Sequence, residues 1–346
     1  MDISRIFQPR TLPLLLASAA LLVSGCGDDD DNGGDTTTSE RDNGAATTDT
    51  TETDAAPAAP SIASSRVIEL PGARVFPEGI ALDESGSRMF VSSTTDGRVF
   101  TGTLESERLA PLAVGTNGPT AAIGLATGPD NALWVAGGDT GTLWRLDQSG
   151  GDVAGAHKVP GTGPTFLNDV AVAEDGTAYV TDSMRPVIYR ITPDAAASAP
   201  LEAWLTLDDT AIKYTEGFNL NGIEFTPDDE QLLVVQGNTG KLFRIPMDGD
   251  APAEVDLGDG KLPSGDGMEI DGQRMFIVLG DSGEVGVVDL ADDFSSGTVG
   301  APLTDPSFAR PTTLEKAGDQ LLVVNSQFNA MDSPKLPFTV SALALE

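Results

Sequence analysis

The chain has 346 residues, of which 53 are Asp or Glu and 20 are Lys or Arg, so its formal net charge at pH 7 is −33. A field of this sign repels phosphate backbones and attracts cations, which argues against nucleic acid as a partner. The single cysteine excludes an internal disulfide.

Residues 1–25 are predicted to be an export signal. Arg5 and Arg10 precede an apolar run over residues 12–23, which is too short for an ordinary membrane span, and small residues then lead to Cys26. This ending resembles a bacterial lipoprotein signal, and the resemblance implies that Cys26 is acylated and begins the mature protein. We therefore expect an exported lipoprotein at the outer membrane, on its periplasmic or cell-surface side, attached through the N-terminal lipid only. An unprocessed or simply secreted chain is the alternative.

Residues 26–60 are predicted to be a disordered acidic linker. Four consecutive Asp occupy positions 28–31, and Gly, Asn, Thr, Ala and Pro follow with almost no large apolar side chain. Such a segment cannot bury enough surface to compensate for the entropy lost on ordering. We expect a flexible tether between the lipid and the folded domain.

Residues 61–346 are predicted to form one all-β domain, a six-bladed β-propeller. Six related segments are spaced 45, 45, 53, 45 and 45 residues apart, and they begin at Glu78, Ile123, Asn168, Asn221, Asp266 and Pro311. Each has an alternating apolar run, a turn rich in Asp, Gly and Pro, and a second apolar run, which is typical of a β-hairpin. A repeat of about 45 residues holds the four strands of a propeller blade. A β-sandwich with coincidental spacing is the alternative.

The N-terminal strand is predicted to close the ring. The apolar run at residues 66–70 precedes the first repeat, whereas the last repeat has only one clear extra strand, at residues 338–345. We expect the first of these runs to complete the last blade, which leaves few free sheet edges.

The residues that open the six repeats are expected to surround one end of the central channel. Four of them carry side-chain oxygen: Glu78, Asn168, Asn221 and Asp266. Two carboxylates that converge there repel each other and lose hydration unless a cation lies between them. Ligation by oxygen alone favours Ca²⁺, with Zn²⁺, Mn²⁺ and Mg²⁺ as other candidates. Alternatively, Asn and Asp simply begin strands after turns.

These motifs resemble the family of senescence marker protein, gluconolactonase and luciferin-regenerating enzyme over about residues 66–346. The motifs are PEG at 77–79, ND at 168–169, NG at 221–222 and DGM at 266–268. The resemblance implies that Glu78, Asn168, Asn221 and Asp266 bind one catalytic metal and that Asp266 also acts as general base or nucleophile.

Two departures from that family concern the substrate. Sugar lactonases of the family carry a substrate-binding Arg two residues before the first Asn, where this chain has Phe166, so we expect a less polar lactone or ester. The only histidine, His157, is assigned to the outer strand of the second blade and to packing. The expected reaction is hydrolysis in which the metal polarises the carbonyl and Asp266 or a metal-bound water provides the nucleophile.

Further substrate contacts are expected from two segments. Asp182 follows the second strand of the third repeat, so it either orients substrate or lies in a solvated turn. The long third step places about eight extra residues near 207–219, and we predict that Tyr214, Glu216 and Phe218 form a pocket wall or lid; an ordinary surface insertion is the alternative.

The sequence thus favours a lipid-anchored, metal-dependent hydrolase of lactones or related esters. The protein is expected to be a monomer that acts on a small molecule. The alternative is a non-catalytic propeller that binds a ligand or a protein and keeps the metal as a structural element.

Overall fold

The computed structural model describes residues 59–346 except Thr116. The predicted signal peptide, Cys26 and nearly all of the predicted linker therefore lie outside the described residues. Within the described part, no helix has the length and hydrophobicity that a membrane crossing requires.

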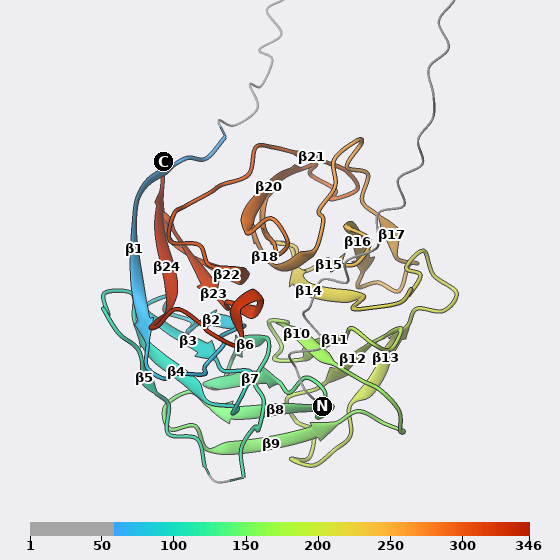
Figure 1. The fold of residues 1–346 in the computed structure, drawn as a ribbon. Helices are drawn as coiled ribbons and strands as arrows, with labels where there is room; N and C mark the ends of the chain where they lie inside the picture. Colours follow the sequence, from blue (N-terminus) through green and yellow to red (C-terminus); the bar gives the residue numbers. More distant parts are fainter. Residues whose placement is uncertain (1–58, 116) are drawn as a thin grey trace, which may run out of the picture. The chain divides into compact units, whose positions relative to one another are not determined.

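Six four-stranded antiparallel sheets form the domain, which confirms the predicted propeller (Figure 1). Blades one and two consist of β2 (Ile80–Leu82), β3 (Arg88–Ser92), β4 (Val99–Thr103) and β5 (Ala110–Pro111), and of β6 (Leu125–Gly128), β7 (Ala132–Ala136), β8 (Thr142–Asp147) and β9 (Val153–Lys158). Blades three and four consist of β10 (Leu167–Val172), β11 (Ala178–Asp182), β12 (Val187–Ile191) and β13 (Glu202–Thr206), and of β14 (Leu220–Phe225), β15 (Gln231–Gln236), β16 (Lys241–Pro246) and β17 (Ala253–Glu254).

The fifth and sixth blades complete the ring. Blade five consists of β18 (Gly265–Asp271), β19 (Arg274–Leu279), β20 (Glu284–Leu290) and β21 (Gly297–Val299). Blade six consists of β22 (Pro311–Ala317), β23 (Gln320–Asn325), β24 (Phe338–Leu345) and β1 (Ile62–Leu70), and the 3-10 helix η2 (Phe328–Ala330) follows β23. The first strand of every blade contacts the first strands of both neighbouring blades, so these six strands line the channel.

The ring closes as predicted, because β1 adds to the outer edge of blade six. It pairs antiparallel with β24 from Ile62 opposite Leu345 to Leu70 opposite Phe338. Ile68 and Leu70 are fully buried in the core between blades six and one. Closure therefore rests on apolar packing as well as on the hydrogen-bond ladder.

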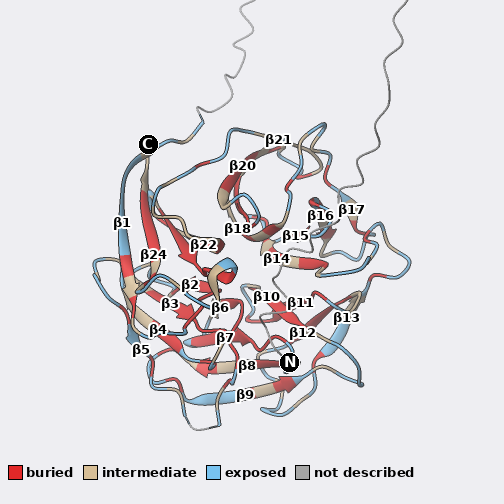
Figure 2. Ribbon diagram, in the orientation of Figure 1, coloured by how far each residue is buried: buried red, intermediate tan, exposed pale blue. Residues whose placement is uncertain are grey.

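The core lies between blades, where alternate residues of each sheet pack against the next sheet. The second strand of each blade is buried along almost its whole length, whereas the outer strands β5 and β13 are largely exposed (Figure 2). Large side chains such as Phe90, Trp134 and Phe276 fill these interfaces. This arrangement fixes each first strand rigidly at the channel.

Glycines let neighbouring first strands approach each other closely. A Cβ atom added to Gly79 would lie 2.3 Å from the carbonyl oxygen of Ile123, and one added to Gly222 would lie 2.5 Å from that of Asp266. Only a residue without Cβ fits such a distance. The glycine after Glu78 and the glycine after Asn221 are therefore needed to hold the channel end narrow.

Candidate functional site

The end of the channel where the first strands begin is called the mouth here, and strand pairing defines the residues that form it. Leu314 has the pairing position in β22 that Met268 has in β18, so the equivalent of Asp266 in blade six is Thr312. The prediction of Pro311 for this position is wrong by one residue, because the last repeat is one residue longer before its first strand. The mouth positions are Glu78, Ile123, Asn168, Asn221, Asp266 and Thr312.

Hydrogen bonds connect these positions around the ring. Side-chain hydroxyls and backbone amides of one blade donate to the backbone carbonyls of the next. The bonds are Thr312 Oγ1 to Glu78 O at 3.0 Å, Gly124 N to Asn168 O at 2.9 Å, and Thr181 Oγ1 to Asn221 O at 2.8 Å. The backbone of the mouth is therefore held in place by bonds between blades.

Three carboxyl groups, those of Glu78, Asp169 and Asp266, interact electrostatically at and next to the mouth positions. Burial, followed by the charges of Asp266 and Asp169, raises the pKa of Glu78 well above its ordinary value. Burial raises the pKa of Asp266 to about 7, against the lowering effect of a hydrogen bond with Asn221 and of the positive charge of Arg310. Burial likewise raises the pKa of Asp169 to about 7. The carboxylate forms are thus costly without a compensating positive charge.

Asn168 presents an oxygen without a partner. Its side chain is 5% exposed, and its Nδ2 donates to Ser183 Oγ at 2.9 Å. Among the described residues, its Oδ1 accepts no hydrogen bond. A buried carbonyl oxygen without a donor is unfavourable by about 1–3 kcal/mol, and a cation at the mouth would remove this penalty.

The donor set therefore fits a hard cation. In the described part of the chain, no group of three or more His, Cys, Asp or Glu side chains could hold a metal ion alone. A cation at the mouth would depend on two carboxylates, Glu78 and Asp266, and on the carboxamide oxygens of Asn168 and Asn221. Such all-oxygen ligation, completed by water, suits Ca²⁺.

One side of the mouth is apolar. Phe166 and Phe218 make an edge-to-face contact with ring centroids 4.9 Å apart, and Ile123 belongs to the same cluster. A Cβ on Gly138 would lie 3.1–3.3 Å from Ile123 and Phe166, so this glycine packs directly against both. We call Ile123, Phe166 and Phe218 the apolar wall.

Asp182 shapes the loop behind the apolar wall. Its side chain is fully buried, and its carboxylate accepts hydrogen bonds from Thr165 Oγ1 and from the backbone N–H groups of Phe166 (3.0 Å), Met184 (2.9 Å) and Arg185 (3.0 Å). Neither expectation for Asp182, substrate orientation or a solvated turn, matches this environment. The residue fixes the backbone of Phe166 instead.

The segment between β13 and β14 leads to the first strand of blade four, as predicted. Tyr214 donates from its hydroxyl to the carbonyl oxygen of Asp182 at 2.6 Å. Asn219 is 2% exposed, and its side chain bonds to the backbone of Thr215 and Gly217. Glu216 lies on the exposed part of the segment. The segment is thus anchored, which favours a fixed wall over a lid.

His157 lies in β9, the outermost strand of blade two, as expected. It is 3% exposed, its Nδ1 lies 2.9 Å from the carbonyl oxygen of Ala199, and its ring packs against Trp134. Burial lowers the pKa of this imidazole. A packing role accounts for these contacts.

Arg310 is a residue of the mouth that no sequence motif indicated. This residue directly precedes β22, as Phe166 directly precedes β10, and the two strands pair with the same register. Its Nη2 lies 3.1 Å from Oδ1 of Asp281. Aligning the residue before each first strand would have shown a guanidinium at this place, two residues before the mouth position.

Three glutamates that no sequence motif indicated lie deeper in the channel, and we call them the glutamate half-ring. Glu224, Glu269 and Glu315 occupy one register position in blades four, five and six, opposite Leu233, Phe276 and Leu322. Burial, then the charges of the other carboxyls, raises the pKa of each, and that of Glu315 reaches about 8.

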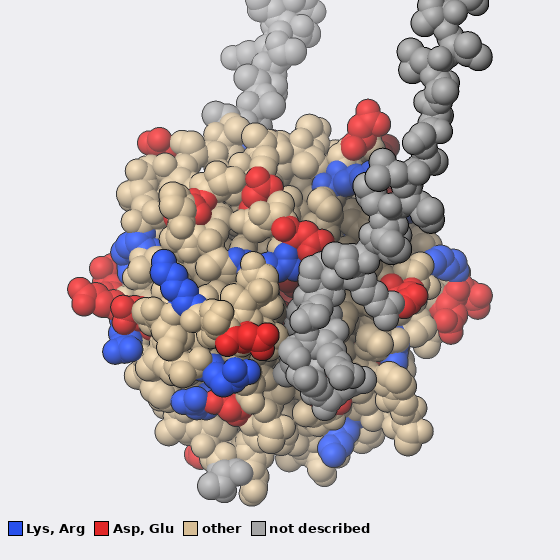
Figure 3. All heavy atoms as spheres, in the orientation of Figure 1, with Lys and Arg blue, Asp and Glu red and all other residues tan. Residues whose placement is uncertain are grey.

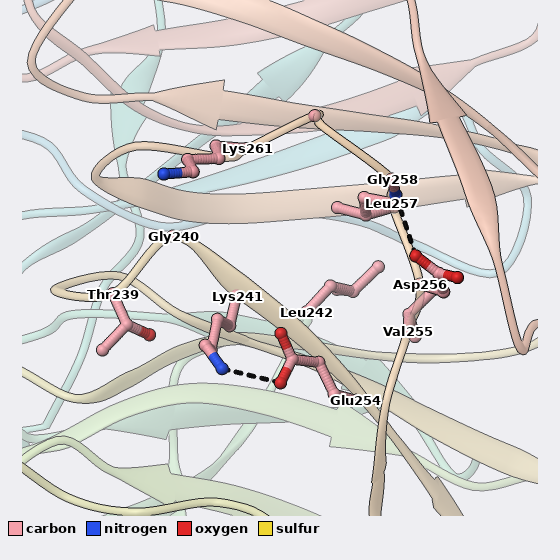
Figure 4. A pocket seen from close by; sticks show the side chains of 11 residues that line it. Thr239, Gly240, Lys241, Leu242, Glu254, Val255, Asp256, Leu257, Gly258 and Lys261 are labelled. Atoms are coloured by element: carbon pink, nitrogen blue, oxygen red, sulfur yellow. Dashed lines mark hydrogen bonds and ion pairs between the residues drawn. The ribbon is translucent and has the colours of Figure 1, made fainter.

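A cavity of about 420 Å³ lies at the outer edge of blade four, beside β17 (Figure 4). Two of its charged side chains pair with each other, Lys241 with Glu254 at 2.7 Å, and Asp256 accepts from the backbone N–H of Gly258 at 2.9 Å. No mouth residue lines it. It therefore does not belong to the candidate site.

Surface charges give no sign of a nucleic-acid interface on the face shown in Figure 3. Lys and Arg side chains are scattered there among Asp and Glu, without a continuous basic area. This pattern agrees with the net charge of −33.

The fold and the mouth define a six-bladed β-propeller with a candidate cation site at one end of its channel. No protein-family profile matches the chain. Among curated proteins, it is similar to the adipocyte plasma membrane-associated protein of Salmo salar, with 26% identity over 151 residues. That match spans 41% of this chain and only 36% of the relative's length.

Solved structures with the same fold include several enzymes. The virginiamycin B lyase of Staphylococcus aureus superposes with a TM-score of 0.56 and 14% identity, over 82% of this chain and 99% of that one. A gluconolactonase of Xanthomonas campestris gives 0.56 and 19%, over 83% and 91% of the chains. A luciferin-regenerating enzyme gives 0.59 and 12%, over 81% and 95%. At these identities the likeness establishes the fold alone.

Proposed function

We propose that the chain is a metal-dependent hydrolase of lactones or related esters, with a divalent cation, Ca²⁺ in the first place, at the mouth. The observation that carries this proposal is the buried Oδ1 of Asn168, which has no hydrogen-bond partner among the described residues. It lies in the same ring of mouth positions as the carboxyl groups of Glu78 and Asp266. The gluconolactonase and luciferin-regenerating enzyme with this fold support the substrate class by analogy.

The mouth residues have two roles in the proposed reaction, cation binding and proton transfer. In the proposed mechanism, Glu78, Asn168, Asn221 and Asp266 would hold the cation, which would supply Lewis-acid polarisation of the substrate carbonyl. Asp266 accepts a proton from the attacking water while the water oxygen bonds to the carbonyl carbon. The carbon–oxygen bond to the alcohol then breaks, and the alcohol oxygen takes that proton from Asp266. The apolar wall binds the apolar part of the substrate.

The decisive experiment is a panel of lactones and esters assayed on protein stripped with EDTA and refilled with Ca²⁺, Mn²⁺, Zn²⁺ or Mg²⁺. We expect activity to return with one of these ions in the wild type and in Asp259→Asn, whose side chain is exposed and is not one of the mouth positions. Asp266→Asn should stay inactive with every ion. Thermal stabilisation by Ca²⁺ without any turnover would refute the hydrolase and favour a binding propeller with a structural ion.

We also propose that the protein is a monomeric lipoprotein anchored through Cys26 at the outer membrane. The lipoprotein-like residues before Cys26 and the acidic stretch after it support this proposal. Incorporation of labelled fatty acid into the wild type and its loss in Cys26→Ala would test the anchor. Recovery of the wild type in the soluble fraction without lipid would contradict it.

A further inference from the structure

Arg310 lies at the mouth on the side opposite the apolar wall. It directly precedes β22 of blade six, and Phe166 directly precedes β10 of blade three in the same register. Blades three and six are three steps apart in a ring of six, so the two residues face each other across the channel axis. The mouth thus has an apolar side and a side with a guanidinium.

The guanidinium is held in place by neighbouring residues of blade five. Ser264 Oγ donates to Oδ2 of Asp281 at 2.5 Å, and Oδ1 of Asp281 pairs with Nη2 of Arg310 at 3.1 Å. A Cβ on Gly280 would lie 3.7 Å from both Cζ and Nη2 of Arg310, which places the group against that backbone. A Ser–Asp–Arg chain of this kind orients the planar donor group before any ligand arrives.

Most donors of this guanidinium remain available. A guanidinium has five N–H groups. In the part of the chain that the structure describes, the side chain of Arg310 makes one hydrogen bond, from Nη2 to Oδ1 of Asp281. The side chain is 22% exposed. Arg310 lies two residues before the mouth position Thr312, at the start of β22. A substrate oxygen on this side of the mouth would therefore meet unused donors.

Charge decides which oxygen fits best. Asp281 already balances the charge of Arg310, and the net charge of −33 repels anions from the whole chain. An uncharged carbonyl oxygen avoids this repulsion and still forms a charge-assisted hydrogen bond. The same position would be less favourable for a carboxylate.

We propose that Arg310 is a substrate-binding residue that donates hydrogen bonds to a second, uncharged carbonyl oxygen of the substrate, on the side of the mouth opposite the apolar wall. This inference rests on the proposed hydrolase. It narrows the substrate class to amphipathic lactones or esters that have an apolar body against Phe166 and Phe218 and an amide or ketone group beyond the reacting carbonyl.

The test separates binding from turnover. The ligands are three non-hydrolysable amide analogues of one aryl ester, which end in an alkyl group, an uncharged acetamide group or a carboxylate group. Each analogue is titrated calorimetrically into Ca²⁺-treated wild type, Arg310→Gln and Arg310→Lys. Arg108→Gln is the matched control, because Arg108 pairs with Glu69 on the exposed surface. We expect about a 10- to 100-fold weaker affinity of Arg310→Gln for the acetamide analogue, no change for the alkyl analogue, and partial rescue by Arg310→Lys.

Each other outcome is informative. Equal losses for the acetamide and alkyl analogues, or no binding of the acetamide analogue to wild type, would overturn the role of Arg310. Tightest binding of the carboxylate analogue, with the largest loss in Arg310→Gln, would overturn the uncharged acceptor. If the corresponding esters are not hydrolysed but the acetamide analogue binds through Arg310, the proposed reaction fails and the binding role stands.

Discussion

Replacing Glu315 by Gln should stabilise the protein at high pH. Glu315 belongs to the glutamate half-ring, where burial and the charges of Glu224 and Asp169 raise its pKa from 4.5 to about 8. Between these pH values the folded chain keeps the proton that the unfolded chain has released. Stability is therefore highest, as far as this group is concerned, below about pH 4.5, and it falls as the pH rises to about 8. A neutral Gln of similar size removes this dependence.

The size of the effect follows from the same pKa values. A rise from 4.5 to about 8 corresponds to roughly 5 kcal/mol at pH 9, because one pKa unit is worth about 1.4 kcal/mol. Movement of the side chain toward water in the channel lowers this figure, so we expect Glu315→Gln to raise the free energy of unfolding at pH 9 by about 2–5 kcal/mol. At pH 4 the two proteins should differ little.

Urea unfolding at pH 4, 7 and 9, with EDTA present to remove divalent cations, measures this difference. Glu84→Gln is the control, because Glu84 is exposed in the turn of blade one and should behave like wild type at each pH. A Glu315→Gln protein that is less stable than wild type at pH 9, or that differs from it equally at all three pH values, would refute the reasoning.

The remaining predictions concern the mouth, the ring closure and the apolar wall. Ca²⁺ binding should release protons at pH 6–7, because burial raises the pKa of Glu78 and brings that of Asp266 to about 7; calorimetry in buffers of different ionisation enthalpy should show this, and equal heats would argue against it. Ile68→Ala should lower the free energy of unfolding by about 2–5 kcal/mol, whereas Val67→Ala, 44% exposed, should change it by less than about 0.5 kcal/mol. Phe218→Ala should lower kcat/KM for apolar esters by about tenfold without weakening Ca²⁺ binding, and equal losses for polar and apolar esters would speak against the apolar wall.

The fold could be predicted from the sequence because turn residues mark the boundaries of the strands in each repeat. The turn residues recur at a nearly constant step, and the alternation of apolar residues marks the strands on both sides of each turn. Closure by the N-terminal strand followed from counting strands in the last repeat. The single register error, Pro311 in place of Thr312, arose because one added residue before β22 leaves the hydrophobic pattern of that repeat intact.

Less of the site could be predicted, since side-chain environments depend on contacts between distant segments. The role of Asp182 depends on three backbone N–H groups that point at its carboxylate, and no sequence pattern shows their direction. Arg310 and the glutamate half-ring lie at register positions other than the mouth position, so an alignment of the opening residues alone could not reveal them. Comparing every position of the six first strands would have found both.

The partnership of β1 with β24 also bears on how the protein is made. Ser61 bonds to Glu346 across 285 positions of the chain, so β1 lacks its ladder partner β24 until the ribosome has synthesised residues 338–345. Contacts this distant in sequence form slowly. The ring of blades would consequently stay open until β24 has been synthesised.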